Sequence, residues 1–195
     1  NLGMHFSIIN YPDKVILDEL HYTTDAKLIL QEHTTSRTEH PPLGKLLVAA
    51  NMAIFGDNPV GWRTFPIIFG TASILLFFLI CRRLNMSLLS SNIALFLLTF
   101  ENLNFVQGSV AMLDVFCLTF ILLSFWLYLR RSYPLSGVAI ALATLTKLTG
   151  VFAIVVIFIY WVVVRRREYL YFVGTMGVAW LAFMAMLLLF EFAIY

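Results

Sequence analysis

Long apolar runs without a charged residue, separated by clusters of arginine, constrain this chain more than any other feature. Residues 64–81, 84–100, 115–129 and 169–190 contain no Asp, Glu, Lys or Arg. A helix that crosses a bilayer needs about 20 mostly apolar residues, within a range of about 17–25. Only 12% of the residues are charged, about half the share in a soluble domain. The sequence therefore predicts an all-α, polytopic bundle of transmembrane helices.

The arginine clusters predict the orientation of these spans. Arg82-Arg83, Arg130-Arg131 and the arginines at 165–167 hold seven of the 13 Lys and Arg residues. Cytoplasmic loops are enriched in Lys and Arg, so all three clusters are expected in the cytoplasm. Residues 1–63 then form an extracytoplasmic or lumenal loop, and residues 64–195 form a bundle of about six spans. The expected spans are 64–81 inward, 87–105 outward, 113–129 inward, two within 132–164, and 169–190 outward.

Lys147 divides the segment 132–164 into two short apolar runs. A helical run of about 15 residues rises roughly 22 Å, less than the hydrocarbon core of about 30 Å. We therefore expect Lys147 below the outer surface, in a water-filled or protein-lined recess. Ionisable residues at membrane depth are usually functional. The alternative is a lysine whose amine snorkels to the headgroups.

The outer segment carries most of the acidic residues, and two of them are adjacent. Asp18 and Glu19 cannot share one face of a helix. We expect one to point toward a site and the other toward a structural partner. A carboxylate here can accept a proton from an attacking hydroxyl or bind a divalent metal; the simpler alternative is a solvated loop acid.

The stretch TEHPPLGKLL, residues 38–47, predicts the start of a short helix. Pro41-Pro42 suits a first helical turn, and Gly56-Asp57-Asn58-Pro59 is a stop signal. The helix between them is too short to span a bilayer, so we expect an interfacial helix on the outer leaflet. Glu39 and His40 lie at its N-terminus, where free N–H groups favour an anion.

A third polar segment, FENLNFVQGSVAMLDVF, separates two of the spans. Glu101 lies at the end of one span and Asp114 opens the next. Asp114 either faces the bundle, as functional acids do, or is stabilised by the helix dipole. With Asp18, Glu39 and Lys147, these residues predict a carboxylate-rich cavity on the outer side, with a cation for a phosphate.

Five segments in this order resemble the protein O-mannosyltransferase family, which are GT-C-type membrane glycosyltransferases that use lipid-phosphate-linked sugars. They are LDELHY, EHPPLGKLL, FGDNPVGWR, FENLNFVQGSVAMLD and SGVAIALATLTKLTGVF. The resemblance implies a GT-C-like fold, a larger module with further spans, and transfer of a sugar, with mannose expected, to a protein Ser/Thr hydroxyl. A lipid acceptor, as in the related aminoarabinose transferases, stays open because Thr38 stands where an acid is usual in protein mannosyltransferases.

The resemblance also assigns roles to single residues. Asp18 matches the catalytic aspartate, and Glu19 is its acidic neighbour. Lys147 matches a lysine that holds the donor phosphate. The resemblance implies no required cofactor, although Glu39 with His40 can hold a divalent metal. The family commonly has an arginine five residues before Asp114, where this chain has Ser109. The residues assigned to substrate binding are Glu39, His40, Lys45, Arg63, Asp114 and Lys147.

The sequence leaves three functional classes open. The first is a membrane transferase with a lipid-phosphate sugar donor, a protein or lipid acceptor, and membrane-protein subunits as further partners; nucleic acid is excluded. The second is a non-catalytic scaffold or assembly subunit with the same fold, favoured by Ser109. The third is a transporter with Asp114 and Lys147 as a coupling pair, which ranks last because no inverted repeat is evident. Cys81 and Cys117 are expected as buried small hydrophobes.

Overall fold

The computed structural model describes residues 2–37 and 39–194, and every regular element in them is a helix. This confirms the all-α class. The elements are α1 (Leu2–Ser7), α2 (Glu19–Glu32), α3 (Pro42–Phe55), α4 (Pro59–Arg83), α5 (Leu88–Thr99), α6 (Asn102–Gln107), α7 (Leu113–Leu129), α8 (Tyr133–Thr146), the 3₁₀ turn η1 (Leu148–Val151), α9 (Phe152–Val164) and α10 (Tyr169–Ile194).

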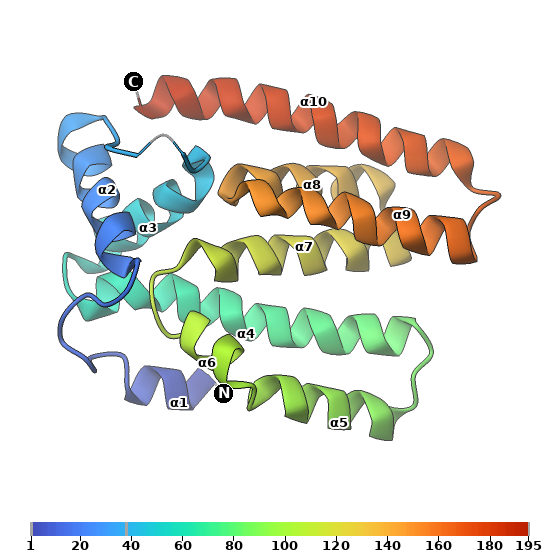
Figure 1. The fold of residues 1–195 in the computed structure, drawn as a ribbon, viewed down its shortest axis with the longest axis horizontal. Coiled ribbons are helices and arrows are strands. Elements are labelled where there is room, and N and C mark those ends of the chain that lie inside the picture. Colours follow the sequence, from blue (N-terminus) through green and yellow to red (C-terminus); the bar gives the residue numbers. More distant parts are fainter. Residues whose placement is uncertain (1, 38, 195) are drawn as a thin grey trace.

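The long helices lie side by side and alternate in direction (Figure 1). The connections α4–α5, α7–α8 and α9–α10 lie at one end of the bundle, and the three arginine clusters lie in these connections or in the last turn before them. Helices α2 and α3 lie at the opposite end. The arrangement is the one that the charge pattern predicts for alternating spans.

Two helices of the described chain are long and apolar enough to cross a membrane, α4 and residues Tyr169–Phe190 of α10. Helices α3, α5, α7 and α8 and the segment Leu148–Val164 are apolar but shorter. The break between α8 and η1 falls at Lys147, whose extended backbone ends α8 (φ −153°, ψ 140°). The segment 132–164 therefore runs across the bundle and back, as expected.

The predicted span 87–105 is wrong as a single helix. Helix α5 ends at Thr99, and Glu101 begins α6 instead. The Glu101 carboxylate accepts hydrogen bonds from the N–H groups of Leu103 (3.0 Å) and Asn104 (2.6 Å). A carboxylate that caps one helix in this way satisfies N–H groups that a continuous helix would have bonded internally.

The predicted short helix after Pro41-Pro42 is α3, but protein covers much of it. Val48, Ala49 and Met52 belong to a buried cluster with residues of α2 and of the segment before α7. Ile54 and Phe55, near its end, are exposed. Helix α3 therefore joins the outer segment to the bundle, and its contact with a lipid surface stays a prediction.

Candidate active site

Asp18 and Glu19 are adjacent but differ in burial. Asp18 is exposed and precedes α2, and its side chain makes no capping hydrogen bond. Glu19 is 0% exposed. Its Oε1 accepts from the Ala111 N–H (3.0 Å) and its Oε2 accepts from the Ile16 N–H (3.2 Å). The accessible carboxylate of the pair is Asp18.

Arg63 on α4 makes the remaining hydrogen bonds to the Glu19 carboxylate. Its Nε and Nη2 donate to the two carboxylate oxygens at 3.0 and 2.9 Å, the bidentate geometry that suits a guanidinium. Its remaining N–H groups donate to the carbonyls of Ile9 (2.9 Å), Pro12 (2.7 Å) and Lys14 (3.0 Å). Arginine has five N–H donors, and all are used inside the protein.

These contacts favour a positioning role for Glu19 and Arg63, whose predicted parts in catalysis and substrate binding stay predictions. A group that touches substrate needs an exposed atom or an unused donor, and neither residue has one in the described structure. Arg63 is 1% exposed. We assign both to positioning: together they fix the segment before α2, and hence Asp18, against α4 and the start of α7.

Lys45 is also buried, at 1% exposure. Its Nζ lies 2.9 Å from Asp25 Oδ2 and donates to Thr35 Oγ1 at 2.9 Å and to the Arg37 carbonyl. These partners all belong to α2 or to the α2–α3 connection. All of these Nζ contacts are made within the protein, and the predicted substrate contact of Lys45 stays a prediction.

Asp114 and Lys147 form an ion pair, with Lys147 Nζ 2.7 Å from Asp114 Oδ1. Asp114 is in the first turn of α7, and Lys147 lies at the break between α8 and η1. Their side chains are 39% and 25% exposed, respectively. Lys147 is therefore partly exposed beside Asp114, and its place in a recess stays a prediction. One of its three ammonium N–H donors is used by Asp114 in the described structure, which leaves two.

Gly44 brings the outer segment against this pair. A Cβ on Gly44 would lie 2.7 Å from Leu113 Cδ2 and 3.1 Å from the Thr146 carbonyl oxygen. Leu113 and Thr146 immediately precede Asp114 and Lys147. Only glycine allows so close an approach, so the motif from His40 to Lys45 lies next to the two predicted site residues.

Tyr22 lies between the predicted motifs, and the sequence analysis missed it. Its N–H bonds the Asp18 carbonyl one turn earlier (3.2 Å), and its ring meets the His40 ring edge-on at 5.8 Å. Burial, then the negative charges of Asp18 and Asp114, raise the pKa of Tyr22 to about 12, with Glu39 adding to the rise and Arg37 opposing it. The charges of Asp18, Asp114, Glu39 and Arg37 therefore all affect the hydroxyl group of Tyr22. The feature of the sequence that could have indicated Tyr22 is its position four residues after Asp18, one helical turn away.

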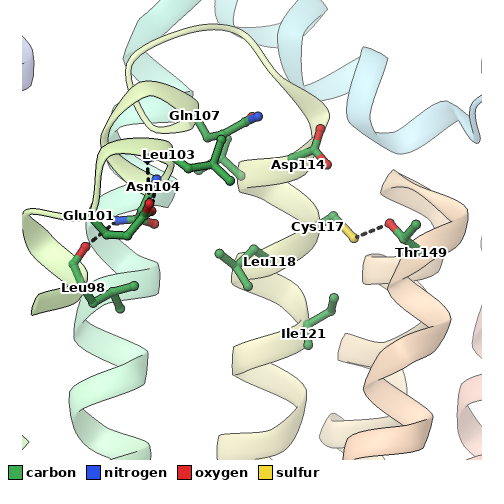
Figure 2. Close-up of a pocket in the computed structure, with 11 residues that line it drawn as sticks. Leu98, Glu101, Leu103, Asn104, Gln107, Asp114, Cys117, Leu118, Ile121 and Thr149 are labelled. Carbon is green, nitrogen blue, oxygen red and sulfur yellow. Dashed lines mark hydrogen bonds between the residues drawn. The ribbon is translucent and has the colours of Figure 1, made fainter. Parts of the chain in front are cut away.

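A cavity of about 380 Å³ lies between α6, α7 and η1. Figure 2 shows Asp114 at its upper end, with Gln107 and Asn104 on α6 and the apolar Leu118 and Ile121 further down α7. The Gln107 Oε1 is buried without a hydrogen-bond partner. Cys117, buried as expected, lines the wall 3.9 Å from Thr149 Oγ1. The cavity therefore has a polar end, which includes the carboxylates of Glu101 and Asp114, above an apolar wall.

Ser109, at the position where the family commonly has an arginine, contacts α1. Its Oγ lies 2.8 Å from His5 Nδ1, and the His5 ring stacks on Phe105 at 4.4 Å. The sequence analysis did not single out His5. At this position the structure therefore has a neutral hydroxyl paired with a buried imidazole ring.

The metal hypothesis gains no support from the geometry. Within residues 2–37 and 39–194, no three His, Cys, Asp or Glu side chains come together in a way that could hold an ion. Glu39 is exposed, and His40 is half-buried against Tyr22. Thr38 lies outside the described residues. A metal at Glu39 and His40 stays a prediction.

Comparison with solved structures defines the class of fold. The structure of the Saccharomyces cerevisiae protein O-mannosyltransferase Pmt1–Pmt2 complex bound to the sugar donor is similar over 100% of this chain and 32% of the other, with a TM-score of 0.73 and 20% identity. The chain thus has the helical fold of part of that membrane complex.

The family model for dolichyl-phosphate-mannose-protein mannosyltransferase matches residues 51–195. The chain belongs to this family, which confirms the resemblance seen in its motifs. The polyprenol-phosphate-mannose–protein mannosyltransferase of Mycobacterium tuberculosis H37Rv is 36% identical over 116 residues, which cover 56% of this chain and 22% of that protein.

A eukaryotic relative shows the same similarity over a longer stretch. Dolichyl-phosphate-mannose–protein mannosyltransferase 1 of Candida albicans is 26% identical over 175 residues, which cover 75% of this chain and 20% of that protein. The chain spans about a fifth of the length of the curated relatives it matches.

Proposed function

We propose that this chain forms the donor site and catalytic aspartate of a membrane mannosyltransferase. The enzyme would transfer mannose from a polyprenyl- or dolichyl-phosphate to a Ser/Thr hydroxyl of a protein, on the extracytoplasmic or lumenal side. One observation carries the proposal: Asp114, which holds the partly exposed Lys147 in an ion pair, lines the polar end of an amphiphilic cavity, and both Asp114 and the exposed Asp18 act electrostatically on Tyr22. Family membership supports the reaction class.

The cavity supports a lipid-linked donor. Its apolar wall would take the first part of the polyprenyl chain, and its polar end would take the phosphate. Lys147 would donate to the phosphate oxygens with the N–H groups not used by Asp114. Asp114 would hold the ammonium in place, as a positioning residue that already contacts it at 2.7 Å.

Asp18 would act as the general base. The acceptor hydroxyl oxygen attacks the anomeric carbon, its proton passes to the Asp18 carboxylate, and the bond from that carbon to the phosphate oxygen breaks. The polyprenyl phosphate leaves with the electron pair, and Lys147 would hold its phosphate before and after the bond breaks. The family resemblance implies inversion at the anomeric carbon. No metal is needed for this sequence of steps.

The proposed membrane topology follows from the apolar runs and the arginine clusters of the sequence. We place residues 1–63 outside and residues 64–195 in a bundle of about six spans, with α8 and α9 as two short spans that meet at Lys147. The multi-pass protein would belong to a larger module. The structurally similar Pmt1–Pmt2 is a protein O-mannosyltransferase complex, so we include a related membrane subunit among the expected partners.

A transfer assay tests the proposal. Membranes containing the protein are given polyprenyl-phosphate mannose and a Ser/Thr-containing acceptor peptide, and mannosylated peptide is measured. Transfer that is lost in Asp18→Asn and kept in Asp13→Asn, which changes another exposed acid of the same segment, would support it. Equal transfer by wild type and Asp18→Asn would overturn the assignment of the base.

The scaffold reading is favoured by one observation, the neutral Ser109–His5 contact at the usual arginine position. It predicts that the wild-type protein has no transfer activity with any lipid-phosphate sugar, yet still assembles with its membrane partners. The same assay, with co-purification of subunits, distinguishes the two functions.

A further inference from the structure

A buried ion pair joins α2 to α3 and is not used by the proposed reaction. Asp25 on α2 and Lys45 on α3 are 2.9 Å apart, and their side chains are 0% and 1% exposed. Lysine and aspartate are almost never fully buried unless they are paired. A pair of this kind is weak evidence for added stability, since well-packed apolar residues often do as well.

The hydrogen bonds that Asp25 and Lys45 make to other residues are more informative than the stability that the ion pair contributes. Asp25 Oδ1 accepts from the Ser36 N–H (3.1 Å) and the Ser36 hydroxyl (2.6 Å). Lys45 donates to Thr35 Oγ1 and to the Arg37 carbonyl. Both charged groups therefore direct their hydrogen bonds to three consecutive residues of the connection between α2 and α3.

The same connection carries His40, which contacts the helix that follows the proposed base. His40 packs its ring against Tyr22, and Tyr22 lies one turn from Asp18. Glu39, beside His40, is exposed. A shift of the connection would therefore move His40 and Glu39 relative to Asp18, while the Asp114–Lys147 pair would keep its own contact.

The connection lies on the side from which a water-soluble acceptor would arrive. Helices α2 and α3 lie beyond the end of the bundle opposite the arginine clusters (Figure 1). The amphiphilic cavity opens between α6, α7 and η1 (Figure 2). The two substrates of the proposed reaction would thus meet at Asp18 from different sides.

We propose that Asp25 and Lys45 are a positioning pair that fixes the described residues of the connection, 33–37 and 39–41, as a wall of the acceptor-binding site. Lys45 then acts through the connection and does not touch either substrate. This inference rests on the proposed function for its kinetic consequences. The conformational consequence, an ordered connection held by the pair, is independent of activity.

The kinetic test compares Lys45→Met, Asp25→Asn and the double variant. We expect the KM for the acceptor peptide to rise about tenfold or more, since a displacement of about 1 Å can cost 10²-fold, while the KM for polyprenyl-phosphate mannose changes less than about twofold. The double variant should be no worse than the worse single variant, because the two residues act as a unit. An equal rise in both KM values would overturn the proposal.

The conformational test needs no turnover. A cysteine at the exposed position Glu39→Cys is labelled with a water-soluble maleimide, and the labelling rate is compared with and without Lys45→Met. Cys81 and Cys117 are buried, which keeps the background low. We expect faster labelling when the pair is broken. An unchanged rate in a folded variant would overturn the proposal, and absent wild-type transfer with faster labelling would contradict only the proposed function.

The matched control is an exposed ion pair that also has one member on α2. Lys27 and Asp57 are 2.7 Å apart with side chains 44% and 49% exposed, so Lys27→Met should change neither the acceptor KM nor the labelling rate. If Lys45→Met does not fold, Ser36→Ala removes one hydroxyl hydrogen bond to Asp25 and leaves both charges in place. It should give a smaller rise in the acceptor KM and in the labelling rate. No change in either would overturn the proposal.

Discussion

The N–H of Ala111 donates a hydrogen bond of 3.0 Å to Glu19 Oε1. This contact joins the first turn of α2 to the segment that leads into α7. Asp18 immediately precedes Glu19, and Asp114 is three residues after Ala111. One buried carboxylate therefore sets the relative place of the proposed base and the acid that holds Lys147.

Glu19→Gln should destabilise the fold strongly. The amide keeps the shape of the side chain but leaves Arg63 buried without a charged partner. Breaking a buried pair by changing one member typically costs about 3–5 kcal/mol. Thermal unfolding in detergent should show a clear drop in Tm, and a variant with wild-type Tm would show that the carboxylate is not the support we describe.

Asp18→Asn should have the opposite effect: it should lower activity and leave thermal stability nearly unchanged. Asp18 is exposed and makes no capping hydrogen bond, so Tm should stay close to that of the wild type. Loss of a general base should lower kcat by about 10²–10⁴-fold. The two variants compared side by side separate catalysis from positioning at adjacent residues.

Gly44→Ala should weaken the contact between α3 and the ends of α7 and α8. The added Cβ would meet Leu113 Cδ2 at 2.7 Å and the Thr146 carbonyl oxygen at 3.1 Å. Overpacking of this kind costs about 1–3 kcal/mol. Gly177→Ala is the control, because nothing lies within 4 Å of a Cβ there; equal Tm values for the two variants would contradict the close approach.

Lys147→Met should raise the KM for the lipid-phosphate donor and leave the acceptor KM nearly unchanged. The reason is that the ammonium would hold the phosphate in both the ground state and the transition state, which is the signature of uniform binding. Steady-state kinetics at varied donor concentration measure it. A large fall in kcat at saturating donor would instead place Lys147 in transition-state stabilisation alone.

Tyr22 should remain protonated well above the pH at which an ordinary tyrosine ionises. Burial and the nearby carboxylates raise its pKa to about 12, so the stability gained from the neutral phenol is complete below about pH 10 and is lost as pH rises through 12. The ultraviolet difference between wild type and Tyr22→Phe should show no phenolate signal from Tyr22 at pH 10–11. A signal there would contradict the surroundings described for this ring.

The orientation of the bundle can be tested by labelling. Single cysteines at the exposed positions Asp57 and Arg166 should react with a membrane-impermeant maleimide from opposite sides of the membrane. The expectation follows from the arginine clusters, which favour the cytoplasm. Labelling of both positions from one side would exclude the proposed topology.

The sequence by itself determined the helical class, the end of the bundle that carries arginine, and the segments that meet at the opposite end. These follow from apolar run length and charge asymmetry, which are local properties. It also predicted that Asp18 and Glu19 diverge, because neighbouring residues cannot share a helix face. It did not determine which of the two would be buried.

Only the tertiary structure decided what each charged residue does. Glu19 pairs with Arg63, which is 44 positions away in the sequence, and accepts a hydrogen bond from Ala111, which is 92 positions away. No local pattern specifies partners at such distances. Lys45 and Lys147 look alike as lysines beside apolar runs, yet one is enclosed with Asp25 and the other stays 25% exposed beside Asp114. The physical reason is that a buried charge must be paired, and its available partners depend on how distant segments pack.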